Sequence, residues 1–205
     1  MVSDRTLGVM NHIPSLPRAY KALAARRSMS APDGYLQPEC FGYEFREWVS
    51  PYTKGACTPG YVMLILQDWA SERALSDGIN PDIAALGRDP RRRTNLRLEQ
   101  LLMEVLGFSL RDVYATNVFP FVKPGCMSAP VPQDLVNKMA EVFTAKEVVI
   151  AKPMLVITLG AVAHRALHAL KIKHIPVPHP AARIGGIESH KTAWVAALAG
   201  TADDA

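Results

Sequence analysis

The feature that most constrains the fold of this chain is a set of four short apolar runs separated by segments with helical patterning. The runs cover residues 62–66, 113–117, 154–159 and 174–177. Short, continuous apolar runs are typical of strands that are buried on both faces of a parallel sheet. The alternation of strand and helix therefore predicts an α/β fold: a three-layer α/β/α sandwich with a central four-stranded parallel sheet.

The segments between these runs carry helix and turn signals. We predict helices over residues 18–29, 41–49, 96–106, 132–150, 160–170 and 189–199. Residues 70–93 and 118–132 are predicted to be long loops because turn dipeptides and prolines recur in them. We expect a single domain over residues 1–205, in which residues 1–60 form an irregular N-terminal layer and residues 61–185 carry the motif-bearing core.

Composition limits the class of protein and its partners. The chain has 205 residues and a formal net charge of +4, which allows a polyanionic partner such as DNA. Its three cysteines are widely spaced and form no CxxC pair, which favours a reducing compartment and no metal site. No apolar run approaches the roughly 18 residues that a membrane span needs, and the N-terminus lacks the apolar core of a signal peptide. We expect a monomeric, cytoplasmic protein of bacterial type that is associated with the nucleoid if it acts on DNA.

Arginines are concentrated in one short segment. Five of them lie within ten residues: Arg88, Arg91, Arg92, Arg93 and Arg97. The segment is either a solvated loop and helix start or a surface that contacts phosphates through guanidinium groups.

Chemically useful side chains follow the apolar runs. Asp68 follows the first run, Asn117 ends the second and His179 follows the fourth, and the carboxyl ends of parallel strands line one crevice. A carboxylate there positions a water or offsets a cation, or it only caps a turn. An amide reads the edge of a base, or it holds its own loop in an Asx turn. A histidine stabilises a developing anion.

Two further features have structural alternatives. Gly160 follows the third run at a predicted helix start, where it either exposes backbone N–H groups to a phosphate or forms a tight turn. His164 and His168 have the i, i+4 spacing of metal ligands on a helix. With no third ligand in view, a surface or packing role is favoured.

Four ordered segments together resemble motifs of the uracil-DNA glycosylase superfamily, over roughly residues 61–185. Leu66-Gln67-Asp68-Trp69-Ala70 is similar to the first motif, which reads Gly-Gln-Asp-Pro-Tyr in the classical branch. Tyr114-Ala115-Thr116-Asn117-Val118 is similar to Tyr-Ile-Thr-Asn-Val of the thermophile branch. Residues 153–160 with Ala163 resemble the Pro-x-hydrophobic-Leu-Gly-x-x-Ala segment, and His179-Pro180-Ala181-Ala182 resembles the closing His-Pro-Ser/Ala motif.

The resemblance implies a monofunctional DNA glycosylase that hydrolyses the N-glycosidic bond of uracil or another deaminated base, without metal or cofactor. Asp68 would orient water and offset the sugar cation, and His179 would support the departing base. The implied base contacts are Gln67, Trp69, Asn117 and Phe119. The implied backbone contacts are Arg92, Arg93, Gly160, Pro180 and Arg183, and Arg91 and Lys123 are further candidates for phosphate contact.

The chain also departs from the superfamily pattern. Leu66 replaces the first glycine of motif one and Trp69 replaces its proline. The superfamily's stacking ring is missing from residues 92–95, so stacking would come from Trp69, Phe119 or Phe121, or be absent. Three cysteines cannot supply the four-cysteine iron–sulfur cluster of the thermophile branch, and residues 183–186 replace the leucine wedge of the classical branch.

These departures leave two alternatives open. One is a non-catalytic DNA- or nucleobase-binding protein of the same fold, which the missing ring and altered motif one favour. The other is a small-molecule α/β hydrolase or a nucleotide-binding enzyme. The sequence lacks the Gly-x-Ser-x-Gly elbow, the phosphate-binding lysine loop and the dinucleotide fingerprint that such enzymes use.

Overall fold

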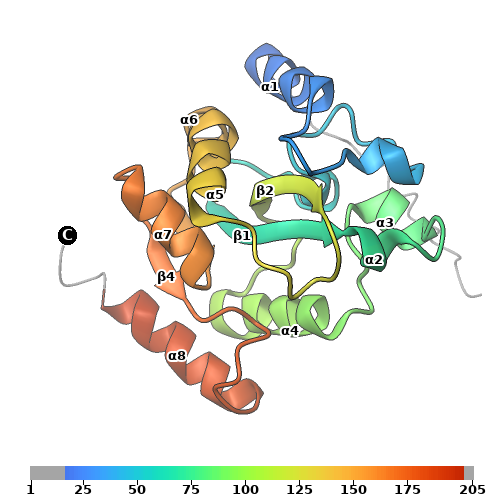
Figure 1. Ribbon diagram of the computed structural model, residues 1–205. Helices are drawn as coiled ribbons and strands as arrows, with labels where there is room; N and C mark the ends of the chain where they lie inside the picture. The colour runs from blue at the N-terminus through green and yellow to red at the C-terminus, as the bar shows by residue number, and fades with distance from the viewer. Residues whose placement is uncertain (1–16, 201–205) are drawn as a thin grey trace, which may run out of the picture.

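The computed structural model describes residues 17–200 and places four parallel strands in one sheet (Figure 1). The strands are β1 (Val62–Ser71), β2 (Tyr114–Lys123), β3 (Leu155–Leu159) and β4 (Ile175–Val177), in the order β2-β1-β3-β4. The predicted central four-stranded parallel sheet is confirmed. The predicted N-terminal layer includes residues 1–16, which lie outside the described residues.

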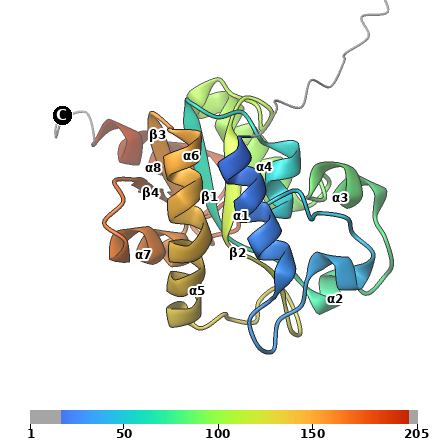
Figure 2. The ribbon, with the colours of Figure 1, turned by 90° about the horizontal axis from the view of Figure 1, so that it is seen from above.

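Helices cover both faces of this sheet. One face carries α1 (Arg18–Met29), α5 (Gln133–Met139), α6 (Ala145–Ala151) and α7 (Ala161–Ala169), and the other carries α4 (Arg93–Leu101) and α8 (Ile187–Ala199). Seen from above, α1 lies beside α6, in front of β1 and β2 (Figure 2). The arrangement is the expected α/β/α sandwich.

The two central strands are longer than their apolar runs. β1 continues to Ser71 and β2 to Lys123, because the two strands keep pairing through Asp68↔Phe119 and, after a register shift, Ala70↔Val122. Leu36 also bridges to Val122 from the N-terminal side, which extends the pairing of β2. Gln67, Asp68 and Trp69 are therefore strand residues, and the predicted loop over 118–132 begins only after Lys123.

The segment between β1 and α4 is partly helical, so the prediction of one long loop over 70–93 was wrong. It contains α2 (Glu72–Leu75) and α3 (Pro81–Leu86). The side chain of Asn80 caps α3 by accepting from the backbone N–H groups of Asp82 and Ile83, and Pro81 suits the first helical position. The predicted helix over 41–49 was also wrong: between α1 and β1 the structure has two short 3₁₀ turns, η1 (Pro38–Phe41) and η2 (Pro51–Gly55).

The other helices lie close to their predicted positions. α4 begins three residues early, with Arg92 at its N-cap, and continues through a π turn, η3 (Leu102–Leu106), to Gly107 in the left-handed conformation. The helix predicted over 132–150 is α5 and α6 joined by a second π turn, η4 (Ala140–Thr144). No helix within residues 17–200 is long and apolar enough to cross a bilayer.

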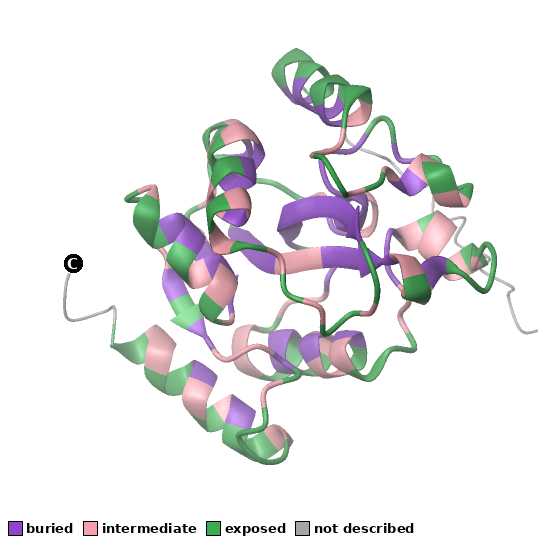
Figure 3. Cartoon of the chain, in the orientation of Figure 1, coloured by how far each residue is buried: buried purple, intermediate pink, exposed green. Residues whose placement is uncertain are grey.

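Most of the aromatic side chains of the N-terminal layer belong to the core. Tyr43, Phe45 and Trp48 are buried, and the Phe45 and Trp69 rings meet edge to face at 5.5 Å. The two central strands are buried along most of their length, and β1 has an intermediate stretch at Gln67 and Asp68 (Figure 3). The layer therefore packs directly on the strand that carries motif one.

A buried carboxyl group lies under α6, on the face of the sheet that α1 covers. Glu147 accepts hydrogen bonds from Tyr114 Oη (2.6 Å) and Thr116 Oγ1 (3.0 Å). Burial raises the pKa of Glu147 to about 7, although the two hydrogen bonds favour its charged form. The carboxyl group is thus protonated in part at neutral pH.

Glu147 should make the fold less stable as the pH rises. Its pKa is higher in the folded chain (about 7) than its ordinary value of 4.5. Its contribution is fully present below pH 4.5 and is lost as the pH rises through 7, a change of about 3–4 kcal/mol. Glu147→Gln should flatten the dependence of the unfolding free energy between pH 5 and pH 8, measured by urea denaturation. An unchanged slope would contradict this assignment.

Candidate active site

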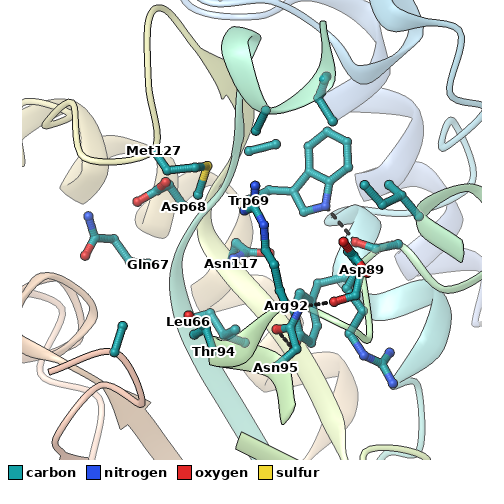
Figure 4. A pocket seen from close by; sticks show the side chains of 18 of the residues that line it. Leu66, Gln67, Asp68, Trp69, Asp89, Arg92, Thr94, Asn95, Asn117 and Met127 are labelled. Atoms are coloured by element: carbon teal, nitrogen blue, oxygen red, sulfur yellow. Dashed lines mark hydrogen bonds between the residues drawn. The ribbon is translucent and has the colours of Figure 1, made fainter. Parts of the chain in front are cut away.

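A cavity of about 510 Å³ opens at the carboxyl ends of β1 and β2, beside the loop that follows β4. It lies where β1 has β2 on one side and β3 on the other, the position at which open α/β sheets bind ligands. Figure 4 shows Gln67, Asp68 and Met127 on one side of the cavity and Trp69 and Asp89 on the other, with Asn117 and Arg92 between them. Of the sequence-predicted residues, the structure brings the following to this cavity: Gln67, Asp68, Trp69, Arg92, Arg93, Asn117 and His179.

Asp68 forms a buried ion pair at the edge of the cavity. Its Oδ2 lies 2.8 Å from Nζ of Lys123, and the two side chains are 7% and 2% exposed. Lys123 also donates to the carbonyl oxygen of Met127 at 2.7 Å. The prediction that Lys123 contacts phosphate was wrong, because its ammonium group is enclosed and neutralised by Asp68. The ion pair fixes Asp68 at the cavity wall.

Asn117 is held by a residue that the sequence did not reveal. Ser50 donates through Oγ to the Asn117 side-chain oxygen at 2.7 Å, and both residues are buried. Within residues 17–200 the Asn117 amide nitrogen has no hydrogen-bond partner, so the NH₂ group is left for the cavity. The two residues are 67 positions apart, and no local pattern at Ser50 could have predicted the contact.

The aromatic rings at the cavity differ from those expected. Phe119 and Phe121 do not line it: both are fully buried, and Phe119 packs between Tyr35 and Phe121. Phe119 is therefore a core residue and not a base contact. Trp69 lines the cavity and donates from Nε1 to the Gly87 carbonyl at 2.7 Å. Tyr52, from the N-terminal layer, supplies a second ring that sequence analysis missed.

His179 faces the same cavity from the loop after β4. Its Nδ1 accepts the backbone N–H of Ala181 at 3.1 Å, which places the ring proton on Nε2 in the neutral form. Burial lowers the pKa of His179. The Asp68 carboxylate opposes this shift, and nearby His190 adds to it. The ring is thus a neutral imidazole at pH 7, able to donate from Nε2.

Three hydrogen bonds fix the loop that carries His179. Trp194 Nε1 donates to the Pro178 carbonyl at 3.2 Å, and Arg97 Nη1 donates to the Pro180 carbonyl at 2.7 Å. His190 Nε2 lies 3.1 Å from the Ala182 carbonyl. The loop is thereby attached to α4 and α8, the two helices on that face of the sheet.

The arginine cluster has separate roles. Arg88 is buried, donates to the Gly55 carbonyl and lies over the Tyr52 ring, and Arg97 holds the His179 loop. Arg91 is exposed and paired with Asp82 at 3.3 Å. Arg92 and Arg93 line the cavity and are exposed there.

A second hollow of about 430 Å³ adjoins the first and is basic. Its lining residues are Arg93, Thr94, Arg97, Pro180, Ala181, Ala182, Arg183 and Gly185. Arg93, Thr94 and Ala181 line both hollows. The predicted backbone contacts Arg93, Pro180 and Arg183 therefore lie together, next to the cavity that holds Asp68.

Gly160 packs directly against the side chain of His179. It adopts φ +86° at the N-cap of α7, and a Cβ added there would lie 2.9 Å from Cβ of His179. The tight turn and the close approach explain the glycine, and Gly160 does not line either hollow. Its observed contact is with the catalytic candidate and not with a phosphate site.

Gly160→Ala should therefore damage the site more than the fold. An alanine at φ +86° and ψ 171°, a backbone region that is essentially confined to glycine, costs about 1–3 kcal/mol, and the displaced His179 loop should slow a reaction at this site by about 10²-fold. Gly107→Ala is a control for a glycine of positive φ without a close neighbour, because Gly107 has φ +72° and nothing lies within 4 Å of an added Cβ. Thermal melts and reaction rates would be compared, and equal losses of activity in the two variants would contradict the role of Gly160.

The described residues contain no group of three or more His, Cys, Asp or Glu side chains that could hold a metal. Nδ1 of His164 lies 2.8 Å from Nε2 of His174, and Nδ1 of His174 lies 2.7 Å from the Ile172 carbonyl. His164 thus serves packing between α7 and the segment before β4.

A comparison with protein families agrees with this geometry. The model of the uracil DNA glycosylase superfamily matches residues 76–199, which include β2, β3, β4 and the His179 loop. None of the curated proteins matches the chain. The family match covers more than half of the sequence, and the chain belongs to the uracil DNA glycosylase superfamily.

Proposed function

We propose that the protein is a monofunctional DNA glycosylase that removes uracil or another deaminated base from DNA. The observation that carries this proposal is the convergence of Asp68, Asn117 and His179 on one cavity. The basic hollow beside that cavity suits the phosphates that flank an extruded nucleotide.

The reaction would be hydrolysis of the N-glycosidic bond. The C1′–N bond breaks with its electron pair on the base, while a water oxygen bonds to C1′ and loses a proton that the base anion finally takes up. Asp68, anchored by Lys123, would orient this water and offset the positive charge on the sugar. Nε2–H of His179 would donate to the departing base anion. The Asn117 amide would hold the base edge.

A panel of labelled oligonucleotides tests the proposal. Each carries uracil, hypoxanthine, xanthine or a mispaired thymine, and alkali cleaves the strand wherever a base has been removed. We expect scission on at least one deaminated base, and its loss in His179→Ala. No scission on any of the four, with DNA still bound, would contradict the proposal.

One observation favours a second candidate function. Asp68 is neutralised by Lys123 at 2.8 Å, so the carboxylate that would assist hydrolysis is already engaged. A protein of this kind could recognise an extruded base without cutting it. Tight, base-dependent binding with no released base would support this alternative.

DNA binding should depend steeply on salt through the basic hollow. Arg93→Ala and Arg183→Ala should each lower the slope of log K against log salt by about 1. Arg91→Ala is the control, because Arg91 is exposed, paired with Asp82 and outside both hollows. Fluorescence anisotropy at several salt concentrations measures the slopes. Equal slopes in Arg93→Ala and Arg91→Ala would argue against this interface.

A further inference from the structure

We propose that Ser50 is a positioning residue that makes the cavity selective for bases with a carbonyl oxygen in place of an amino group. It acts by fixing the side-chain amide of Asn117. The inference rests on the proposed function in one respect, namely that the ligand is a base of DNA. Ser50 lies outside residues 76–199, the part of the chain that the family model matches.

The hydrogen bonds around Ser50 set the direction of the amide. Ser50 Oγ accepts the Tyr52 backbone N–H at 3.3 Å, so its own hydroxyl proton is available to the Asn117 oxygen at 2.7 Å. If the Asn117 amide were reversed, its NH₂ group and the Tyr52 backbone N–H would both point at Ser50 Oγ. The Ser50 hydroxyl proton would then lose its acceptor. Because both residues are buried, an unmade hydrogen bond there is costly, and the reversed amide is disfavoured.

Ser50 itself cannot easily move. It is the N-cap of η2, and Thr53 on the same turn donates from Oγ1 to the Ala115 carbonyl of β2 at 2.8 Å. Gly87 packs so closely on this turn that an added Cβ would overlap the Pro51 carbonyl. The turn is fixed to β2 and to the segment before α4, and Ser50 holds Asn117 from a rigid support.

The fixed amide presents donors to the cavity, and this selects a class of base. Cytosine and adenine carry amino donors at the exocyclic position, whereas a carbonyl oxygen there accepts. Deamination replaces the amino group by a carbonyl oxygen, which converts cytosine into uracil and adenine into hypoxanthine. An amino group facing the Asn117 NH₂ would leave both donors unpaired, which corresponds to roughly ten- to hundredfold weaker binding.

Binding to uncleavable oligonucleotides tests the role of Ser50. The probes carry 2′-fluoro-2′-deoxyuridine or 2′-fluoro-2′-deoxycytidine at one position, because the fluorine suppresses cleavage of the glycosidic bond. The wild type should bind the uridine probe at least tenfold more tightly. Ser50→Ala should bring the ratio of the two Kd values close to one, because its Asn117 amide is free to turn. Ser50→Cys, closer in size and a weak donor, should also lower the ratio if Ser50→Ala fails to fold.

Thr53→Val is the matched control. It removes a buried hydroxyl from the same turn without touching Asn117, so it should lose thermal stability like Ser50→Ala but keep the ratio. The inference would be overturned if folded Ser50→Ala or Ser50→Cys kept the wild-type ratio of the two Kd values. It would also be overturned if Thr53→Val lowered this ratio as much as the Ser50 variants do. Base-dependent binding without any excision would overturn only the glycosylase proposal. Binding of neither probe would overturn both.

Discussion

Lys123→Met should lower the free energy of unfolding by about 3–5 kcal/mol, the largest stability effect that we expect from a single substitution. The ammonium group of Lys123 is enclosed and donates to Asp68 and to the Met127 carbonyl. Removing it leaves the Asp68 carboxylate buried without a counter-charge. Methionine keeps most of the side-chain volume, so the loss would reflect charge and hydrogen bonding more than a cavity.

A double variant separates the effect of the ion pair on stability from the effect of the Asp68 carboxylate on excision. Lys123→Met combined with Asp68→Asn removes both charges and should recover most of the lost stability. Excision should nevertheless be as slow as in Asp68→Asn alone, because the double variant lacks the Asp68 carboxylate. Urea denaturation and excision rates would be measured on Lys123→Met, on Asp68→Asn and on the double variant. If the double variant is no more stable than Lys123→Met alone, the unpaired Asp68 carboxylate is not the cause of the lost stability.

Asp68→Asn should lower the rate of base excision by about 10²–10⁴-fold, the range for a side chain that acts directly on a water or on developing charge. DNA binding should change little, because Asp68 is buried beside the cavity and the exposed arginines of the adjoining hollow remain. Single-turnover kinetics would measure the chemical step, and anisotropy would measure binding.

The matched control for Asp68 is Asp82→Asn. Asp82 carries the same charge but lies at the start of α3, paired with exposed Arg91 and away from the cavity. It should retain nearly full excision. If Asp68→Asn excises bases as fast as Asp82→Asn, Asp68 has no catalytic role.

The sequence predicted the sheet and the positions of the polar residues at its edge. Continuous apolar runs mark strands that are buried on both faces, and the carboxyl ends of such strands meet at one edge. For that reason Asp68, Asn117 and His179 could be expected at one crevice, and the structure places all three at the same cavity. The motif resemblance also agreed with the family match.

The residues that hold these three side chains could not be predicted in the same way. Ser50 reaches Asn117 from an irregular segment 67 residues away, and Lys123 reaches Asp68 only because β1 and β2 pair beyond their apolar runs. Gly160 could be read only as a turn or an anion site until its approach to His179 was seen. Such contacts depend on tertiary packing and leave no periodic pattern in the sequence.

The most direct test of the account is to look for the released base itself. Oligonucleotides that contain uracil or hypoxanthine would be incubated with the protein, and the free base would be measured by mass spectrometry. We expect a stoichiometric free base and an intact strand with one abasic site, and release of the free base about 10²–10⁴-fold more slowly from the Asp68→Asn variant. No free base from wild-type protein that binds these oligonucleotides would contradict glycosidic cleavage by this site.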